Sequence, residues 1–130
     1  TISEIFSNQG EAHFRELEKK TLQGFQADQS MVIATGGGVP CFHDNMQFIK
    51  NNGLSVFLNV ELDDLAKRLY KAQGNNRPLL DKSQSEEAVI ASIKKTYEER
   101  LPFYKQADIQ VDGEINVSQL LWLIDQYMPV

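Results

Sequence analysis

Three short apolar runs, separated by helical patterns, constrain the fold of this chain more than any other feature. The runs are Met31–Ala34, Ser55–Val60 and Asp108–Val111. The first two are typical of strands covered on both faces. Strands that alternate with helices pair in parallel within a layered α/β sheet, which binds ligands at the carboxyl ends of its strands. We therefore expect the glycine triplet Gly36–Gly38, which follows the first run, at such an edge.

Helical patterns fill the intervals between these runs. A short helix is predicted over Ser3–Asn8, with Ser3 as its N-cap, and Gly10 breaks it. Apolar residues at helical spacing predict further helices over Glu11–Phe25, His43–Asn51, Asp63–Lys71, Glu86–Arg100 (ended by Pro102) and Val117–Met128. Gln73–Pro78 is expected to be polar and mobile, and Trp122 is expected to face the core from the last helix.

Composition narrows the class of protein. A length of 130 residues suits one domain with a core. The net charge of −5 argues against a nucleic-acid or membrane binder, although a local arginine cluster can still bind a small anion. The single cysteine, Cys41, excludes an internal disulfide and fits a reducing compartment. We expect a cytoplasmic domain without nucleic-acid or membrane partners.

The glycine triplet has two interpretations. Gly36, Gly37 and Gly38 can form a tight turn that needs positive φ, for which one glycine is normally enough. Alternatively, the missing side chains let the backbone approach a ligand, with its N–H groups facing an anion or a hydroxyl. The sequence by itself leaves both open.

Three arginines are candidates for anion binding. Arg15 and Glu18 are three residues apart on a predicted helix, which favours a surface ion pair; alternatively, Glu18 holds the guanidinium for a carboxylate ligand. Arg77, in "NNRPLL", is either a surface residue or an arginine that stabilises phosphoryl transfer. Arg100, at a predicted helix end, either complements the helix dipole or completes a carboxylate clamp.

The order of the motifs is more specific than any one of them. Across essentially the whole chain, "EIF…GE…FRELE", "VIATGGG", "VFLNV", "NRPLL" and "RLPFY…AD…V" follow one another. This order resembles the shikimate kinase family. The resemblance implies a small P-loop kinase with a five-stranded parallel sheet. It also implies transfer of phosphate from ATP, with Mg²⁺, to the 3-hydroxyl of shikimate, giving shikimate 3-phosphate for aromatic amino-acid biosynthesis, by a protein that is monomeric when complete.

The resemblance also implies a role for each candidate residue. Arg15 and Arg100 match the arginines that grip the shikimate carboxylate, and Glu18 orients Arg15. The substrate site further includes Gly36, Gly37 (the position that contacts a hydroxyl), Gly38, Phe6 and Phe14. The ATP side comprises Arg77, which resembles the catalytic lid arginine, and the adenine-side candidates Lys71 and Val117.

One family motif does not occur in the sequence. The phosphate loop G-x-x-x-x-G-K-[ST] is missing from these residues, as is the aspartate that follows the second strand in the family. We therefore expect a C-terminal portion of a kinase whose Mg²⁺ ligands precede Thr1. The expected fold is a three-layer α/β parallel sheet of the P-loop kinase type without its first two strands. A single domain would span 1–130, with substrate binding over about 1–30 and core and lid over about 31–130.

Two other functions are kept as alternatives. The first is a non-catalytic domain that binds shikimate or a similar hydroxy-carboxylate but not ATP. The second is a kinase for another small polyol acid, such as gluconate. The paired arginines and the triple glycine match shikimate kinase more closely than this second alternative.

Overall fold

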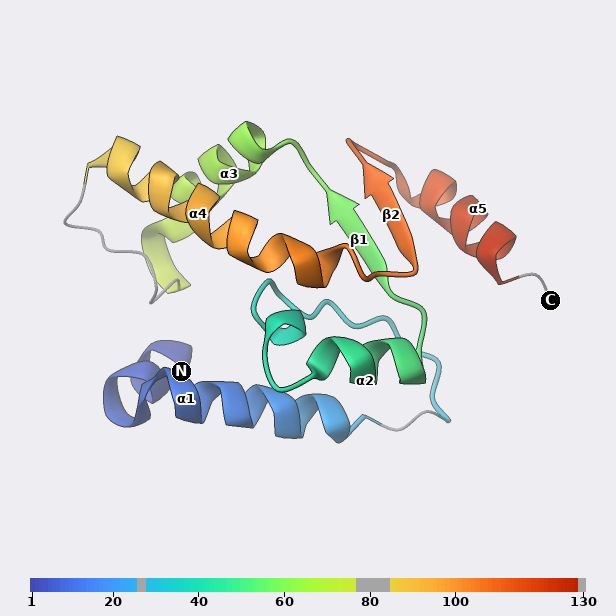
Figure 1. The fold of residues 1–130 in the computed structure, drawn as a ribbon, viewed down its shortest axis with the longest axis horizontal. Helices are drawn as coiled ribbons and strands as arrows, with labels where there is room; N and C mark the ends of the chain where they lie inside the picture. Colours follow the sequence, from blue (N-terminus) through green and yellow to red (C-terminus); the bar gives the residue numbers. More distant parts are fainter. Residues whose placement is uncertain (26–27, 77–84, 129–130) are drawn as a thin grey trace.

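The computed structural model describes residues 1–25, 28–76 and 85–128 (Figure 1). Within these ranges the elements are α1 (Ile2–Gln23), the 3₁₀ turn η1 (Val39–Cys41), α2 (Asn45–Asn52), β1 (Val56–Asn59), α3 (Leu62–Asn76), α4 (Glu86–Tyr104), β2 (Ile109–Asp112) and α5 (Val117–Tyr127). From α2 onward each strand is preceded and followed by a helix, as the sequence predicts for an α/β fold.

The two strands form a parallel pair. Val56 lies opposite Ile109, and the register continues to Asn59 opposite Asp112. Side chains lock the start of this pair, because the Ser55 N–H and hydroxyl both donate to the Asp108 carboxylate, at 3.0 and 2.8 Å. The Asp108 N–H in turn donates to the Ser55 hydroxyl at 2.8 Å. Parallel pairing of the second and third predicted strands is therefore confirmed.

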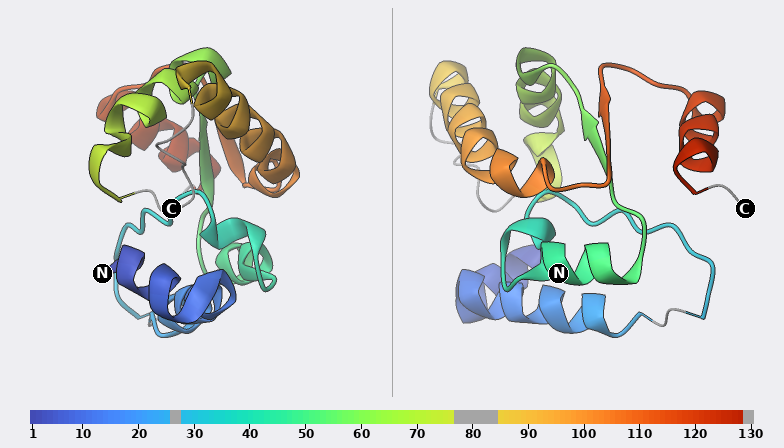
Figure 2. Two further views of the ribbon diagram at one scale, coloured as in Figure 1. Left: turned by 90° about the vertical axis from the view of Figure 1, so that its left-hand side faces the viewer. Right: turned by 45° about the vertical axis from the view of Figure 1, so that its right-hand side comes forward.

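The helices lie in separate groups around the strands. The α3 and α4 helices pack together through Ala66, Val89 and Ile93, which are buried. Both helices lie on one side of the strand pair, and α5 lies on the other (Figures 1 and 2). The α1 and α2 helices lie beyond the end at which the strands begin, and η1 contacts α1, α2 and α4. The η1 turn is therefore where the two halves of the described structure meet.

The first predicted strand is wrong. Met31–Ala34 belongs to neither a strand nor a helix and pairs with no strand in the described ranges, and Val32 is fully exposed. A strand exists only by pairing, and an apolar run cannot supply its own partner. The second strand is also less buried than expected, because Leu58 is 51% exposed. The glycine turn lies toward the beginning of β1 rather than at a carboxyl edge of the sheet (Figure 1).

Several helix boundaries differ from expectation. The predicted break at Gly10 is confirmed, since its φ of 81° and ψ of 171° kink α1, but Thr1 rather than Ser3 caps this helix. Pro102 does not end α4, which continues to Tyr104. A proline lacks only its own N–H, and the Lys105 N–H still donates to the Leu101 carbonyl at 2.9 Å.

Two further expectations concern α3 and α5. The predicted polar segment 73–78 is helical as far as Asn76, since α3 extends to that residue; positions 77 and 78 lie outside the described ranges. Trp122 is 61% exposed, so the predicted core-facing role on α5 is wrong. None of the residues of α5 is buried, because the described elements do not cover this helix. Within the described part of the chain, we find no helix with the length and apolar character needed to span a membrane.

Candidate functional site

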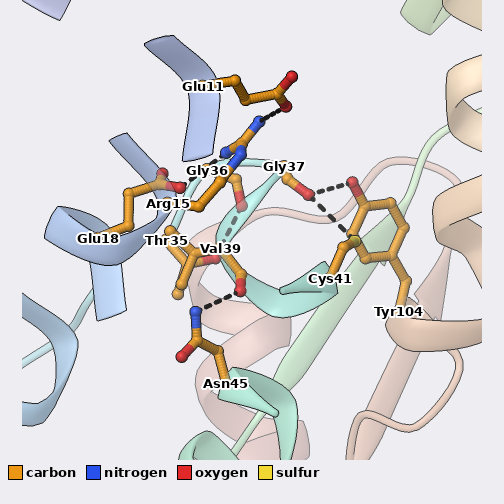
Figure 3. Close-up of polar contacts among 10 residues, drawn as sticks. All are labelled: Glu11, Arg15, Glu18, Thr35, Gly36, Gly37, Val39, Cys41, Asn45 and Tyr104. Atoms are coloured by element: carbon orange, nitrogen blue, oxygen red, sulfur yellow. Dashed lines mark hydrogen bonds and ion pairs between the residues drawn. The ribbon is translucent and has the colours of Figure 1, made fainter. Parts of the chain in front are cut away.

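Arg15 is the centre of the candidate site. It lies on α1 and is only 5% exposed, so the expected surface ion pair is in fact largely buried. Its Nη1 donates to Glu18 at 2.7 Å, and its Nη2 donates to Glu11 at 3.3 Å (Figure 3). The two carboxylates come from positions three and four residues away on the same helix, so α1 supplies both ion-pair partners of the guanidinium.

Aromatic rings complete the surroundings of this guanidinium. Its Cζ lies 4.3 Å from the ring centroid of Phe42 and 5.2 Å from that of Phe14. The Nε–H of Arg15 is buried and finds no hydrogen-bond acceptor in the described ranges. An arginine held against aromatic faces with a spare donor is well suited to take an anionic ligand.

Two adjacent glycines leave room for an arginine of α1 and an arginine of α4 to approach the same turn. A Cβ on Gly38 would stand 2.8 Å from the Cζ of Arg15 and 3.0 Å from its Nη2. A Cβ on Gly37 would stand 3.0 Å from both the Nη1 of Arg100 and the hydroxyl of Tyr104. Close approach of two arginines is therefore the reason that these two positions lack side chains.

Gly36 serves the turn in another way. Its φ is 74°, a conformation that favours glycine, and a Cβ there would meet nothing within 4 Å. Both interpretations of the triplet thus apply, at different positions: a turn that needs positive φ at Gly36, and close approach of side chains at Gly37 and Gly38.

Hydrogen bonds to carbonyl groups hold the turn in place. The Tyr104 hydroxyl donates to the Gly37 carbonyl at 2.6 Å, and the Cys41 thiol approaches the same oxygen at 3.6 Å. The buried Asn45 amide donates to the Val39 carbonyl at 2.9 Å (Figure 3). None of the N–H groups of the glycine triplet donates to an acceptor among the described residues. These N–H groups are therefore available to a ligand.

Burial keeps two side chains at the turn neutral. It raises the pKa of the Cys41 thiol, against the opposing effect of the Arg100 and Arg15 charges. Burial also raises the pKa of Tyr104, again opposed by Arg100. At neutral pH the thiol is therefore a weak nucleophile, and the tyrosine hydroxyl keeps the proton that it donates to Gly37.

The remaining predicted residues divide into three groups. Phe6 and Phe14 lie together, with ring centroids 4.9 Å apart, because the kink at Gly10 folds the first turns of α1 back on the rest. Lys71 is exposed on α3 and Val117 is 73% exposed at the start of α5, so the two adenine-side candidates lie on opposite sides of the strands. Arg77 lies outside the described residues.

Arg100 lies near a helix end, as the sequence predicts. Four other residues of the candidate site were not predicted from the sequence. Because α4 continues to Tyr104, Arg100 lies one turn before its end. Glu11 and Tyr104 each stand four residues from an arginine, a spacing that could have indicated them. Phe42 and Asn45 carry no such signal, since tertiary contact alone brings them to the site. Among the described residues, no three His, Cys, Asp or Glu side chains form a cluster able to hold a metal ion.

Comparison with known proteins gives one consistent family. A family model described as shikimate kinase matches residues 1–123. The shikimate kinase of Parabacteroides distasonis is 42% identical over 113 residues, which is 87% of this chain and 64% of that protein. The shikimate kinase of Bacteroides thetaiotaomicron is 45% identical over 107 residues, covering 82% and 60%. The chain therefore spans about three fifths of the length of these relatives.

Solved structures agree with this comparison. A crystal structure of shikimate kinase from Bacteroides thetaiotaomicron matches with a TM-score of 0.80 and 35% identity, covering 100% of this chain and 76% of that one. A crystal structure of shikimate kinase from Aquifex aeolicus matches with a TM-score of 0.72 and 32% identity, with the same coverage. The α/β fold with parallel strands is therefore that of these enzymes.

Proposed function

The chain belongs to the shikimate kinase family, and on this premise we propose that the protein transfers the γ-phosphoryl group of ATP to the 3-hydroxyl of shikimate. The product of this reaction is shikimate 3-phosphate. The observation that carries the proposal is the meeting of Arg15 and Arg100 at the adjacent glycines Gly38 and Gly37. Shikimate carries one carboxylate and three hydroxyls, and this turn offers donors for both kinds of group.

The arginines would bind the carboxylate. Glu18 holds Arg15 at 2.7 Å, while the spare donors of Arg15 and those of Arg100 are planar forks suited to a carboxylate. Burial of Arg15 excludes water and strengthens each charge-assisted bond. The clamp would therefore fix the orientation of the ring as well as binding it.

The glycine turn would contact the hydroxyls. The N–H groups of Gly36, Gly37 and Gly38 are available as donors, and Phe6 and Phe14 supply an apolar wall for the ring. Holding the acceptor hydroxyl in one place contributes much of the rate enhancement in phosphoryl transfer, because that reaction depends on positioning and electrostatics.

The proposed use of ATP and Mg²⁺ follows from membership of the family. ATP and Mg²⁺ are the co-substrate and metal that the family implies, with Arg77 acting on the phosphates and Lys71 and Val117 beside the adenine. The described residues hold no cluster of three His, Cys, Asp or Glu side chains that could bind a metal ion, and the binding chemistry above rests on the arginines and the glycine turn.

Calorimetric titration of shikimate tests the substrate site. Arg15→Ala and Arg100→Ala should each weaken binding by roughly 30-fold or more, the loss expected for a charge-assisted hydrogen-bonding group. Arg68→Ala is the matched control, because Arg68 forms an exposed ion pair with Glu114 at 3.1 Å on α3. Equal losses in all three variants, or none in the first two, would overturn the assignment.

A phosphorylation assay with ATP, Mg²⁺ and shikimate tests the reaction. Production of shikimate 3-phosphate supports the kinase. Shikimate binding without turnover would indicate a binding domain, and turnover with gluconate instead of shikimate would indicate another polyol-acid kinase. The proposal also includes a cytoplasmic monomer, which size-exclusion chromatography with light scattering and cell fractionation can check.

A further inference from the structure

Tyr104 lies where it can control the shape of the glycine turn. It is the last residue of α4 and stands four positions after Arg100, so both side chains lie on one face of the helix. Its hydroxyl donates to the Gly37 carbonyl at 2.6 Å, while its ring lies 5.3 Å from that of Phe57 on β1 and 6.3 Å from that of Tyr97. The strand and helix therefore hold the ring, and the ring presents its hydroxyl to the turn.

Because a peptide group is planar, holding its C=O in one direction also sets the direction of its N–H. The Gly37–Gly38 peptide is trans, so its C=O and N–H point in opposite directions. Figure 3 shows the Gly37 carbonyl directed at Tyr104, with Arg15 on the opposite side of it. The trans geometry therefore directs the Gly38 N–H to the side on which Arg15 lies. Glycine has few conformational restraints of its own, so this peptide plane could otherwise rotate easily.

We propose that Tyr104 is a positioning residue for the substrate site, which aims the Gly38 N–H by holding the Gly37 carbonyl. The inference rests on the proposed function, since the group that this N–H meets is an acceptor oxygen of shikimate bound at Arg15. It explains why α4 continues through Pro102: only a continuous helix places Tyr104 one turn after Arg100. Tyr104 touches no reacting atom and acts through the turn alone.

Tyr104→Phe tests this role because it removes only the hydroxyl. Tyr97→Phe is the matched control, because it keeps the ring that lies 6.3 Å from that of Tyr104 and removes only a hydroxyl that donates to Asn59 at 2.7 Å, away from the turn. We expect Tyr104→Phe to raise the KM for shikimate roughly tenfold, the effect of about one lost hydrogen bond, with the KM for ATP unchanged. Tyr97→Phe should leave both values unchanged, although it removes a bond of the same kind.

Amide hydrogen exchange gives a second readout that needs no substrate. In Tyr104→Phe the amide of Cys41, whose N–H donates to the Gly38 carbonyl at 3.0 Å, should exchange at least severalfold faster than in the wild type, whereas Tyr97→Phe should leave it unchanged. Equal exchange in the two variants, or an equal rise in KM, overturns the inference. If the wild-type protein neither binds nor phosphorylates shikimate, the proposed function fails, and the exchange comparison still decides whether Tyr104 holds the turn.

Discussion

The guanidinium of Arg15 occupies the space that a side chain on Gly38 would need. A Cβ at that position would stand 2.8 Å from Cζ, inside ordinary van der Waals contact. The guanidinium cannot move away freely, because Glu18 binds it at 2.7 Å and Phe42 stacks on it at 4.3 Å. The glycine and the arginine therefore depend on each other, although they come from different parts of the chain.

Gly38→Ala should therefore weaken both shikimate binding and the fold, because a displaced Arg15 also loses its buried ion pair with Glu18. We expect shikimate affinity to fall about tenfold or more, since a displaced Arg15 loses its aligned donors. Gly36→Ala is the matched control: it has no neighbour within 4 Å, and only its φ of 74° is unfavourable. That variant should lose about 1–2 kcal/mol of unfolding free energy from backbone strain. Calorimetry and urea denaturation separate the two effects, and equal affinities in the two alanine variants would contradict the prediction.

Arg15→Ala should also destabilise the fold strongly. Removing Arg15, which is 5% exposed, leaves the Glu18 carboxylate, with only 17% of its side chain exposed, without its partner. Breaking a buried pair in this way costs about 3–5 kcal/mol, whereas the exposed Arg68–Glu114 pair should contribute at most about 1 kcal/mol. Urea denaturation of Arg15→Ala and Arg68→Ala measures both, and the prediction fails if the two losses are the same.

Asp108 should make the stability of the folded protein depend on pH in the acid range. The Ser55 N–H, together with its hydroxyl, holds the pKa of the Asp108 carboxyl below its usual value despite partial desolvation. The unfolded chain therefore takes up this proton first. The stabilisation is complete above the unfolded pKa, about 4, and is lost as pH falls through the lower folded pKa.

Asp108→Asn should therefore be less stable than the wild type at pH 7, with a difference that shrinks toward pH 2. Thermal unfolding across this range is the measurement. Asp125→Asn, at an exposed position of α5, is the control for removing one carboxylate and should change the stability at pH 7 little. A constant difference between wild type and Asp108→Asn at every pH would refute the assignment.

Cys41 should react slowly with alkylating reagents. Burial raises the pKa of its thiol, and only the thiolate is nucleophilic. Iodoacetamide should therefore modify Cys41 more slowly than free cysteine at pH 8, and saturating shikimate should slow it further if the substrate lies at the glycine turn. Mass spectrometry of the intact protein follows the reaction; a rate equal to that of free cysteine would show that the thiol is not held as the structure has it.

Some of the architecture could be predicted from the sequence. Periodicity predicted the helices and the Gly10 break, because these depend on local pattern. The alternation of strand and helix patterns predicted the parallel pairing of the runs near Val56 and Ile109. The strand at Met31–Ala34 and the burial of Trp122 were predicted wrongly for the same reason. Strand pairing and side-chain burial depend on partners that are distant in sequence, and a local pattern carries no information about them. The continuation of α4 past Pro102 was missed because tertiary contacts at Tyr104 outweigh the local preference of proline.

The sequence by itself determined the α/β class, the family and the identity of the arginines and glycines at the candidate site, since those follow from residue type and order. Only the tertiary structure decided that Arg15 is buried, that Arg15 and Arg100 meet at neighbouring glycines, and that Tyr104 holds the turn between them. The physical reason is that burial and hydrogen bonding require groups from α1, η1 and α4 to be close in space. Spacing along one helix cannot reveal that proximity.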